Sequence, residues 1–69
     1  MERINVQSTN IASIGYDAST MTLEIEFLNG NVYQYLDVPQ SVSDALMATQ
    51  SYGQYLAEHI KGKYRYVRV

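Results

Sequence analysis

The sequence has no cysteine, no tryptophan, one proline and one histidine among its 69 residues. The lack of cysteine excludes disulfide bonds, thiolate metal sites and a thiol nucleophile. No apolar run approaches the roughly 20 residues of a membrane-spanning helix. The first residues have neither the basic start nor the apolar stretch of a signal peptide. We therefore expect a cytoplasmic protein that has no membrane segment and is stabilised by packing alone.

What the sequence does have is an apolar fraction of 46%, which is sufficient for a core, and a charged fraction of only 17%. Its length suits one domain spanning residues 1–69. A chain of this size buries only about 60% of the surface that its unfolded form exposes, so we expect a stability of only about a few kcal/mol. Seven of the eight aromatic residues are tyrosine, a large ring with one hydrogen-bonding hydroxyl.

The charges are divided unevenly along the chain. Four of its five cationic residues lie in the last nine positions, where they are interleaved with two tyrosines. The preceding residues carry all seven carboxylates and one cation, Arg3. Cations mixed with aromatic rings can hold a nucleic-acid strand, whereas an acidic surface repels it. The tail is therefore the part of the sequence that points most directly to a function.

Apolar residues alternate with polar ones in the first half of the chain, which predicts strands at residues 3–8, 11–16, 21–27 and 32–36. In the second of these strands, Ala12, Ile14 and Tyr16 are expected to share the apolar face. In the third, Glu24 and Glu26 lie on the polar face, opposite the apolar residues. Asparagine followed by glycine between the last two strands is a hairpin signal.

The length of this hairpin loop decides where two tyrosines point. A two-residue loop leaves Tyr33 and Tyr35 on the polar face. A three-residue loop, with Gly30 in the left-handed conformation, pairs Phe27 with Asn31 and turns both tyrosines to the apolar face. A shift of one residue thus reverses their orientation. We favour the three-residue loop because it joins three apolar residues to two large rings.

Helical periodicity follows the fourth strand and predicts two helices. Ser41 with Asp44, and Ser51 with Gln54, have the spacing of capping boxes. Gly62 is expected to end the second helix in the left-handed conformation. The second helix has an apolar face formed by Tyr52, Tyr55, Leu56, His59 and Ile60.

Residues 63–68 alternate again and predict a final short strand or extended tail. The order of elements is strands, then helices, then this terminal segment. It predicts an α+β fold, in which an antiparallel β-meander has two short helices packed on one face and a short C-terminal extended strand.

Several short motifs, in this order and spacing, resemble the KTSC domain family: Ile14-Gly15-Tyr16-Asp17, Leu23-x-Ile25-x-Phe27-x-x-Gly30, Tyr33-x-Tyr35-x-x-Val38-Pro39, Ser51-x-Gly53 and Ile60-Lys61-x-x-Tyr64. The resemblance covers about residues 8–69. The family takes its name from the C-terminal domain of some lysyl-tRNA synthetases, and its members also occur as small free-standing bacterial proteins. The resemblance implies RNA as a candidate ligand. The pI of about 5.0 differs from the value above 9 that is typical of strongly basic binding domains.

We expect no catalytic site, cofactor or metal. His59 is the only histidine, and Ser51 and Asp44 are better explained as helix caps than as its catalytic partners. No spacing of a calcium loop is present. Gly53 lies in the first turn of the second helix, which is unfavourable for glycine. It indicates either close packing against a neighbouring element or an approach of the backbone to an anion.

Three interpretations of the basic tail remain open. It is an edge strand whose cations prevent unwanted pairing, or it docks beside the strand of Glu24 and Glu26. It is a nucleic-acid site, in which cations contact phosphates and tyrosines stack on bases. It is a surface for a protein partner or for a homodimer. The candidate binding residues are Lys61, Lys63, Tyr64, Arg65, Tyr66 and Arg68, together with Tyr33 and Tyr35.

Overall fold

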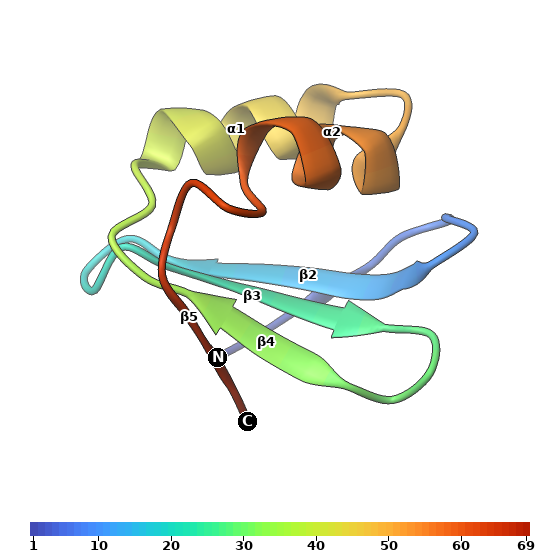
Figure 1. The fold of residues 1–69 in the computed structure, drawn as a ribbon, viewed down its shortest axis with the longest axis horizontal. Helices are drawn as coiled ribbons and strands as arrows, with labels where there is room; N and C mark the ends of the chain where they lie inside the picture. Colours follow the sequence, from blue (N-terminus) through green and yellow to red (C-terminus); the bar gives the residue numbers. More distant parts are fainter.

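The computed structural model describes residues 1–69 as a five-stranded antiparallel sheet with two helices on one face (Figure 1). The elements are β1 (Ile4–Asn5), β2 (Ile11–Asp17), β3 (Thr22–Phe27), β4 (Val32–Tyr35), α1 (Gln40–Ala48), α2 (Tyr52–His59) and β5 (Tyr66–Arg68). The strands lie in chain order across the sheet, so β1 and β5 are its edges. The predicted α+β meander with two helices and a C-terminal strand is confirmed.

The hairpin between β3 and β4 has the predicted three-residue loop. Gly30 has a φ of +93°, and its N–H donates to the Phe27 carbonyl at 2.9 Å. The Phe27 N–H donates to the Asn31 carbonyl at 2.8 Å. In this register Tyr33 and Tyr35 lie opposite the apolar residues of β3, on the side of the sheet that faces the helices.

A bulge in β2 changes which side chains reach the core. The register with β3 shifts between Ile11 and Ser13, as occurs where two residues of one strand face one residue of the other. Ile11 is fully buried beside Ile14, whereas Ala12 stays partly exposed. The core residue at this end of β2 is therefore Ile11, where simple alternation predicted Ala12.

The two helices begin differently from the capping prediction. Pro39 is the N-cap of α1, and its carbonyl accepts the N–H of Val42 at 3.0 Å, so Ser41 already lies inside the first turn. Proline suits the start of a helix because its φ is fixed and because the N–H that it lacks is not needed there for a hydrogen bond within the helix. The N-cap of α2 is Ser51, as predicted, but in neither helix does a backbone N–H donate to the side chain of the N-cap residue. Both predicted capping boxes are therefore wrong in their hydrogen bonds.

The core lies between the helices and the inner face of the sheet. Leu46 of α1 and Leu56 of α2, with Ile60 just after it, are at most 1% exposed. His59, which the helical periodicity placed on the same face, is instead exposed and stacks on Tyr55 at a centroid distance of 4.5 Å. The full cluster of buried hydrophobic residues is Ile11, Ile14, Leu23, Ile25, Tyr35, Val38, Leu46, Leu56 and Ile60.

Gly53 packs closely against the loop before β2. A Cβ atom at this position would lie 3.2 Å from Oδ1 of Asn10, closer than most Cβ contacts. This contact favours the packing interpretation of the glycine.

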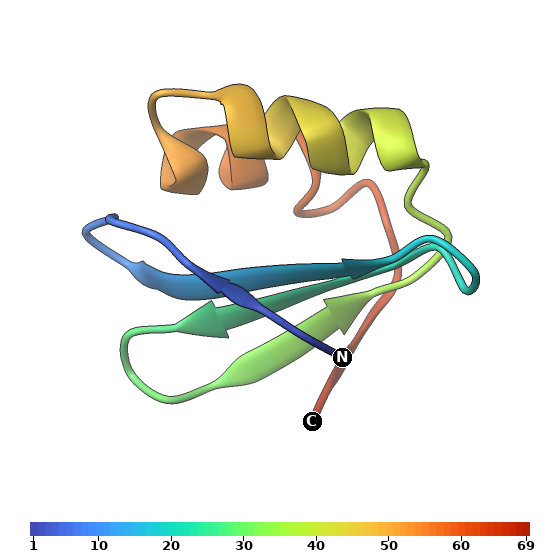
Figure 2. The same cartoon turned by 180° about the vertical axis from the view of Figure 1, so that it is seen from behind.

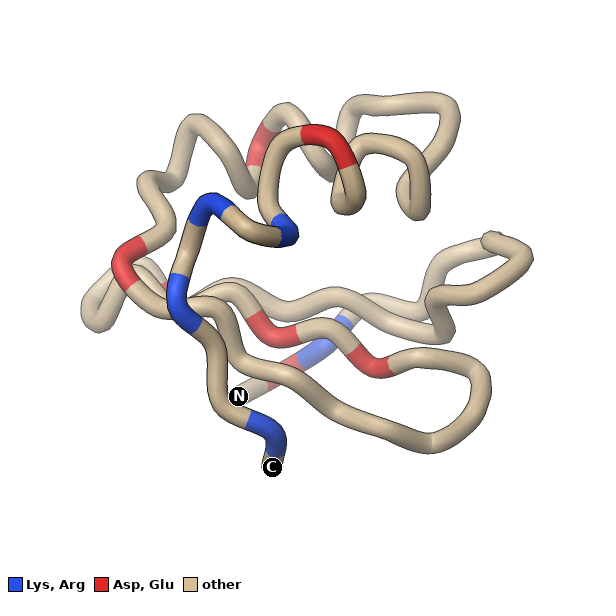
Figure 3. Tube along the Cα trace, in the orientation of Figure 1, with Lys and Arg blue, Asp and Glu red and all other residues tan.

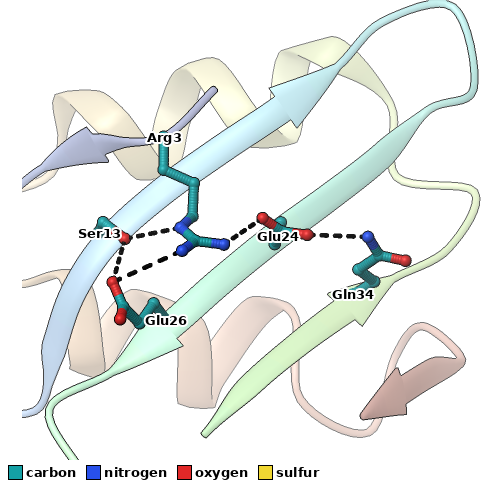
Figure 4. Close-up of polar contacts among 5 residues, drawn as sticks. All are labelled: Arg3, Ser13, Glu24, Glu26 and Gln34. Carbon is teal, nitrogen blue, oxygen red and sulfur yellow. Dashed lines mark hydrogen bonds and ion pairs between the residues drawn. The ribbon is translucent and has the colours of Figure 1, made fainter. Parts of the chain in front are cut away.

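The outer face of the sheet carries a polar network (Figure 4). The Arg3 guanidinium donates to the Ser13 hydroxyl at 3.0 Å and forms an ion pair with Glu24. Glu24 also accepts from the Gln34 amide at 2.8 Å, and Ser13 donates to Glu26 at 2.7 Å. The alternation correctly placed both glutamates away from the core. Glu24 is nevertheless only 6% exposed, because Arg3 and Gln34 cover it.

The N-terminal segment lies across this outer face, as the view from behind shows (Figure 2). Gly15 of β2 makes this close approach possible. A Cβ atom there would lie 2.5 Å from the Glu2 carbonyl oxygen and 2.9 Å from Cγ of Arg3. Glycine at this position therefore lets the chain place the Arg3 guanidinium over β2 and β3.

Candidate nucleic-acid interface

The candidate site begins where α2 ends. The N–H groups of Ile60 and Lys61 both donate to the Leu56 carbonyl, at 3.0 and 2.8 Å. Gly62 then has a φ of +77°, as predicted for the residue that ends the helix. The Tyr64 N–H donates back to the Ile60 carbonyl at 3.3 Å. These bonds turn the chain away from the helix layer and down to the edge of the sheet (Figure 1).

The tail joins the sheet beside β4, the strand of Tyr33 and Tyr35. Tyr66 lies opposite Tyr35, and Arg68 lies opposite Tyr33. The alternative of docking beside the strand of Glu24 and Glu26 is wrong, because β4 already occupies that edge of β3. Pairing with β4 brings the tail beside the two other tyrosines predicted for the site.

Tyr66 lies at the centre of an aromatic cluster. Its ring centroid is 5.5 Å from that of Tyr33, edge to face, and 5.8 Å from that of Tyr35. Aromatic pairs at such distances are favourable. Tyr66 is 61% exposed, whereas Tyr35 is 3% exposed and Tyr64 packs partly buried against the core. Tyr66 therefore offers the largest free ring surface, and Tyr35 supports it from the core side.

A hollow of about 320 Å³ lies beside this cluster. Its lining residues are Tyr33, Tyr35, Lys61, Gly62 and Tyr66. A second, more open hollow of about 500 Å³ adjoins it and is lined by Gly62, Lys63, Tyr64, Arg65 and Tyr66. Seven of the eight candidate residues thus line one of two adjoining hollows. Arg68 lines neither.

Burial changes the acidity of the Tyr35 phenol in the first hollow. Removal from water raises the pKa of Tyr35, because it disfavours the charged phenolate, and the neighbouring Tyr66 and Tyr33 phenols raise it further. Tyr35 therefore remains a neutral phenol well beyond physiological pH. Its hydroxyl can both donate and accept a hydrogen bond.

Two of the four cations contact the hairpin. The Lys61 ammonium lies 5.4 Å from the centroid of the Phe27 ring, within the range of a cation–π interaction. The Arg68 guanidinium donates to the side-chain oxygen of Asn31 at 2.7 Å. Both contacts are to neutral groups, so neither cation loses its positive charge to a carboxylate.

The other two cations extend into solvent. Arg65 lies 3.5 Å from Asp37, but their side chains are 82% and 77% exposed. An ion pair at such exposure contributes only about 0–1 kcal/mol and is screened by salt. Lys63 is exposed and has no ion pair. The positive charge of the tail therefore remains available to a ligand.

Charge is separated in space as well as in sequence. Figure 3 shows Lys and Arg along the segment that leads from α2 to the C-terminus, and most Asp and Glu away from it. The exception is Asp37, in the loop before α1, which lies 3.5 Å from Arg65. The remaining cation is Arg3, which is occupied by the outer polar network. A phosphate backbone would therefore be attracted to the β5 edge rather than to the outer face of the sheet, where Glu24 and Glu26 lie.

Three residues near the site were not among the sequence candidates. Phe27 contacts Tyr33 edge to face at 5.6 Å and Lys61 through its ring. Gly62 lines both hollows, and Asn31 binds Arg68. The hairpin register was the available signal for Phe27, since it places that residue on the same face as Tyr33. No local pattern indicated the contact between Asn31 and Arg68.

The structure also bears on metal and membrane association. No group of three or more histidine, aspartate or glutamate side chains lies close enough together to hold a metal ion. Neither helix has the length and apolar character needed to cross a bilayer.

Fold and surface together define a small α+β domain in which the basic segment after α2 and the tyrosines of β4 and β5 border two hollows. The chain belongs to the KTSC domain family, which matches residues 7–64. A crystal structure of a KTSC domain protein from Yersinia pestis is similar to it, with a TM-score of 0.94, 39% identity, and coverage of 99% of this chain and 96% of that one. The family resemblance and the fold predicted from sequence are therefore both confirmed.

Relatives of two kinds are similar in sequence. An uncharacterised protein of Stutzerimonas stutzeri is 39% identical over 70 residues, which cover all of this chain and 99% of that protein. Lysine–tRNA ligases of Trichormus variabilis and Nostoc punctiforme are 45% and 43% identical over 51 and 56 residues. These segments cover 74% and 81% of this chain but only 9% and 10% of the ligases. The similarity thus concerns a small part of each ligase.

Proposed function

We propose that this chain is a non-catalytic module that binds single-stranded or structured RNA along the β5 edge. In this proposal Lys61, Lys63, Arg65 and Arg68 contact phosphates. Tyr66 stacks on an unpaired base, with Tyr33, Tyr35 and Tyr64 supporting the same surface. Aromatic stacking combined with a cationic track is the usual chemistry of proteins that bind single strands.

The observation that carries the proposal is the exposed Tyr66 ring among cations that are not buried in ion pairs. Tyr66 is 61% exposed although two other tyrosine rings contact it. A large ring held rigid and left open to solvent is typical of a binding surface. Similarity to segments of proteins named lysine–tRNA ligases also supports RNA as the ligand, because the name gives tRNA as a substrate of those proteins.

The salt dependence of binding tests the proposal. A fluorescein-labelled RNA of about ten nucleotides would be titrated with the protein at several salt concentrations, with fluorescence anisotropy as the signal. Each neutralised phosphate of a single strand contributes about −0.7 to the log–log slope, so four contacts predict a slope of roughly −3. A slope near zero, or no binding at low salt, would contradict RNA binding through these cations.

Matched variants separate charge from stacking. Replacing Arg65 and Arg68 together by alanine should weaken binding and reduce the slope by about 1.4 in magnitude, since two contacts are lost. The corresponding double lysine variant retains both charges and should retain the slope. Tyr66→Ala should weaken binding by about 1–3 kcal/mol, the range for one stacked base, while Tyr66→Phe should preserve it.

A second candidate function is protein–protein interaction, with a homodimer or another partner. The supporting observation is the free side of β5. Arg65 and Val69 form backbone hydrogen bonds with Leu36 and Val32, and Val67 lies between them opposite Gln34. Because backbone groups alternate in direction along a strand, the N–H and C=O groups of Tyr66 and Arg68 point away from the sheet. Such an edge can pair with another strand.

Salt distinguishes the two candidates. Strand pairing with burial of tyrosine should respond weakly to salt, whereas phosphate binding should respond steeply. Sedimentation velocity over a range of protein concentrations would detect a homodimer. A monomer at all concentrations, combined with steep salt dependence of RNA binding, would favour the first candidate.

A further inference from the structure

The two hollows at the candidate site differ in chemistry although they adjoin. The first is lined by three tyrosines, with Lys61 as its single cation. The second is lined by two cations, Lys63 and Arg65, with Tyr64 and Tyr66. Tyr66 and Gly62 line both hollows, so an aromatic compartment and a cationic one meet at these two residues. A nucleotide has the same two parts, a flat base and a charged phosphate.

The aromatic hollow offers both a flat surface and a polar contact. Tyr66 supplies a ring, with Tyr33 at 5.5 Å beside it. Tyr35 is 3% exposed, and its hydroxyl is in none of the side-chain hydrogen bonds of the protein. No fully buried side-chain nitrogen or oxygen lacks a partner, so the Tyr35 oxygen keeps some contact with solvent. Tyr35 lines the aromatic hollow. The hydroxyl is thus available to the edge of a ligand.

The size of the aromatic hollow limits what it can hold. About 320 Å³ is near the lower end of the roughly 300–1,000 Å³ typical of small-molecule sites. A hollow of this size suits one base better than a stack of several. The cationic hollow is larger and more open, and both of its cations are exposed. Arg65 also lies 3.5 Å from Asp37, in an exposed ion pair that a phosphate can displace.

We propose that the two hollows receive a single nucleotide of a bound RNA. Its unpaired base occupies the aromatic hollow against Tyr66, and its phosphate occupies the cationic hollow between Lys63 and Arg65. This inference rests on the proposed RNA-binding function and adds that one base per domain is recognised. The remaining nucleotides contact the domain through their phosphates alone.

Lys61 adds a preference among bases. Lys61 lines the aromatic hollow, and its ammonium lies 5.4 Å from the centroid of the Phe27 ring. The ammonium has three N–H donors and no acceptor, so it can contact a base edge as well as a phosphate. A base whose edge carries carbonyl oxygens, such as uracil, satisfies this donor. The amino group of cytosine, a base of the same size, opposes it. Uracil should therefore bind more tightly than cytosine.

The test uses RNA pentamers in which bases are replaced by abasic spacers, so that the backbone charge stays constant. A pentamer with one central uracil should bind about tenfold more tightly than the wholly abasic pentamer, as expected for one stacked base. Adding the other four uracils should change the affinity by less than about threefold. A gain that grows with each added base would overturn the single-base inference.

Variants locate the base. Tyr66→Ala should abolish the difference between the one-base and abasic pentamers, while Tyr66→Phe should retain it. Because Tyr66 is largely exposed, both variants should fold, which circular dichroism would verify. An undiminished difference in Tyr66→Ala would refute the placement of the base. Exchange of the central uracil for cytosine should weaken binding about fivefold, and Lys61→Met should remove that discrimination.

The outcomes separate this inference from the function on which it rests. Salt-dependent binding of the abasic pentamer without any gain from a base would leave RNA binding in place and reject the nucleotide pocket. Failure of every RNA to bind at low salt would reject both. Binding of protein partners with no RNA affinity would assign the β5 edge to the second candidate function.

Discussion

Replacing Arg3 by alanine should destabilise the domain at neutral pH much more than replacing Arg65 by alanine. Both arginines lie near a carboxylate, but their surroundings differ. Arg3 is 30% exposed and pairs with Glu24, whose side chain is 8% exposed, whereas the pair of Arg65 and Asp37 is more than 75% exposed on both sides. The comparison therefore tests whether the outer polar network contributes to stability.

The expected size of the effect follows from the bonds that are lost. Arg3 donates to the Ser13 hydroxyl and to Glu24, and its removal leaves a nearly buried carboxylate with Gln34 as its remaining partner. Hydrogen bonds to charged groups contribute about 1.5–3 kcal/mol each. Partial exposure of Arg3 reduces this contribution, so we expect a loss of about 2 kcal/mol. Arg65→Ala should cost less than about 0.5 kcal/mol.

The effect should also depend on pH. The Gln34 amide lowers the pKa of Glu24 most strongly; burial opposes this shift, and Arg3 lowers the pKa further. A carboxyl whose pKa is lowered on folding stabilises the protein above its unfolded value, near 4.5, and loses this contribution as pH falls through the folded value. The difference between the wild type and Arg3→Ala should therefore shrink in acid.

Urea unfolding followed by far-ultraviolet circular dichroism measures these free energies at pH 7 and at a series of lower pH values. A cycle that combines Arg3→Ala with Glu24→Gln would isolate the coupling between the two side chains. Equal stability of Arg3→Ala and Arg65→Ala at pH 7 would refute the reasoning. So would a cost of Arg3→Ala that stays constant down to pH 3.

Three further predictions concern the fold. Because Leu56 is 1% exposed, Leu56→Ala should lower the free energy of unfolding by about 2–5 kcal/mol, enough to unfold much of so small a domain. A thermal unfolding midpoint equal to that of the wild type would contradict this. Gly30→Ala should destabilise by about 1 kcal/mol because its φ is +93°, and an unchanged urea midpoint would contradict this strain. The unfolding free energy should fall as pH rises above 10, because burial raises the pKa of Tyr35 and the unfolded chain releases its proton first. Tyr35→Phe should remove part of that fall, which alkaline urea titrations would measure.

Local patterns predicted much of the fold correctly. Period-two alternation and the left-handed conformation available to Gly30 led to the correct hairpin register, which placed Tyr33 and Tyr35 on the inner face. Gly62 also ends α2 as predicted. These features depend on neighbouring residues, and the relevant interactions are encoded within a few positions of one another.

Predictions failed where distant residues decide the outcome. The bulge at Ile11 depends on pairing with β3. His59 is exposed although its helical position agreed with the apolar face. In each case alternation or spacing describes which residues can share a face, but packing against another element decides which of them are buried.

The same division applies to the candidate site. The clustering of cations and tyrosines in the tail is visible in the residue order, and it identified the segment by itself. The tail joins β4 because one edge of β4 is left free by the other strands. The contact between Arg68 and Asn31 joins residues that are 37 positions apart in the sequence. Residue order thus determined the chemistry of this edge, because side-chain type is a property of each residue. Only the tertiary structure decided its arrangement, because exposure and neighbours arise when segments remote along the chain compete for the same surface.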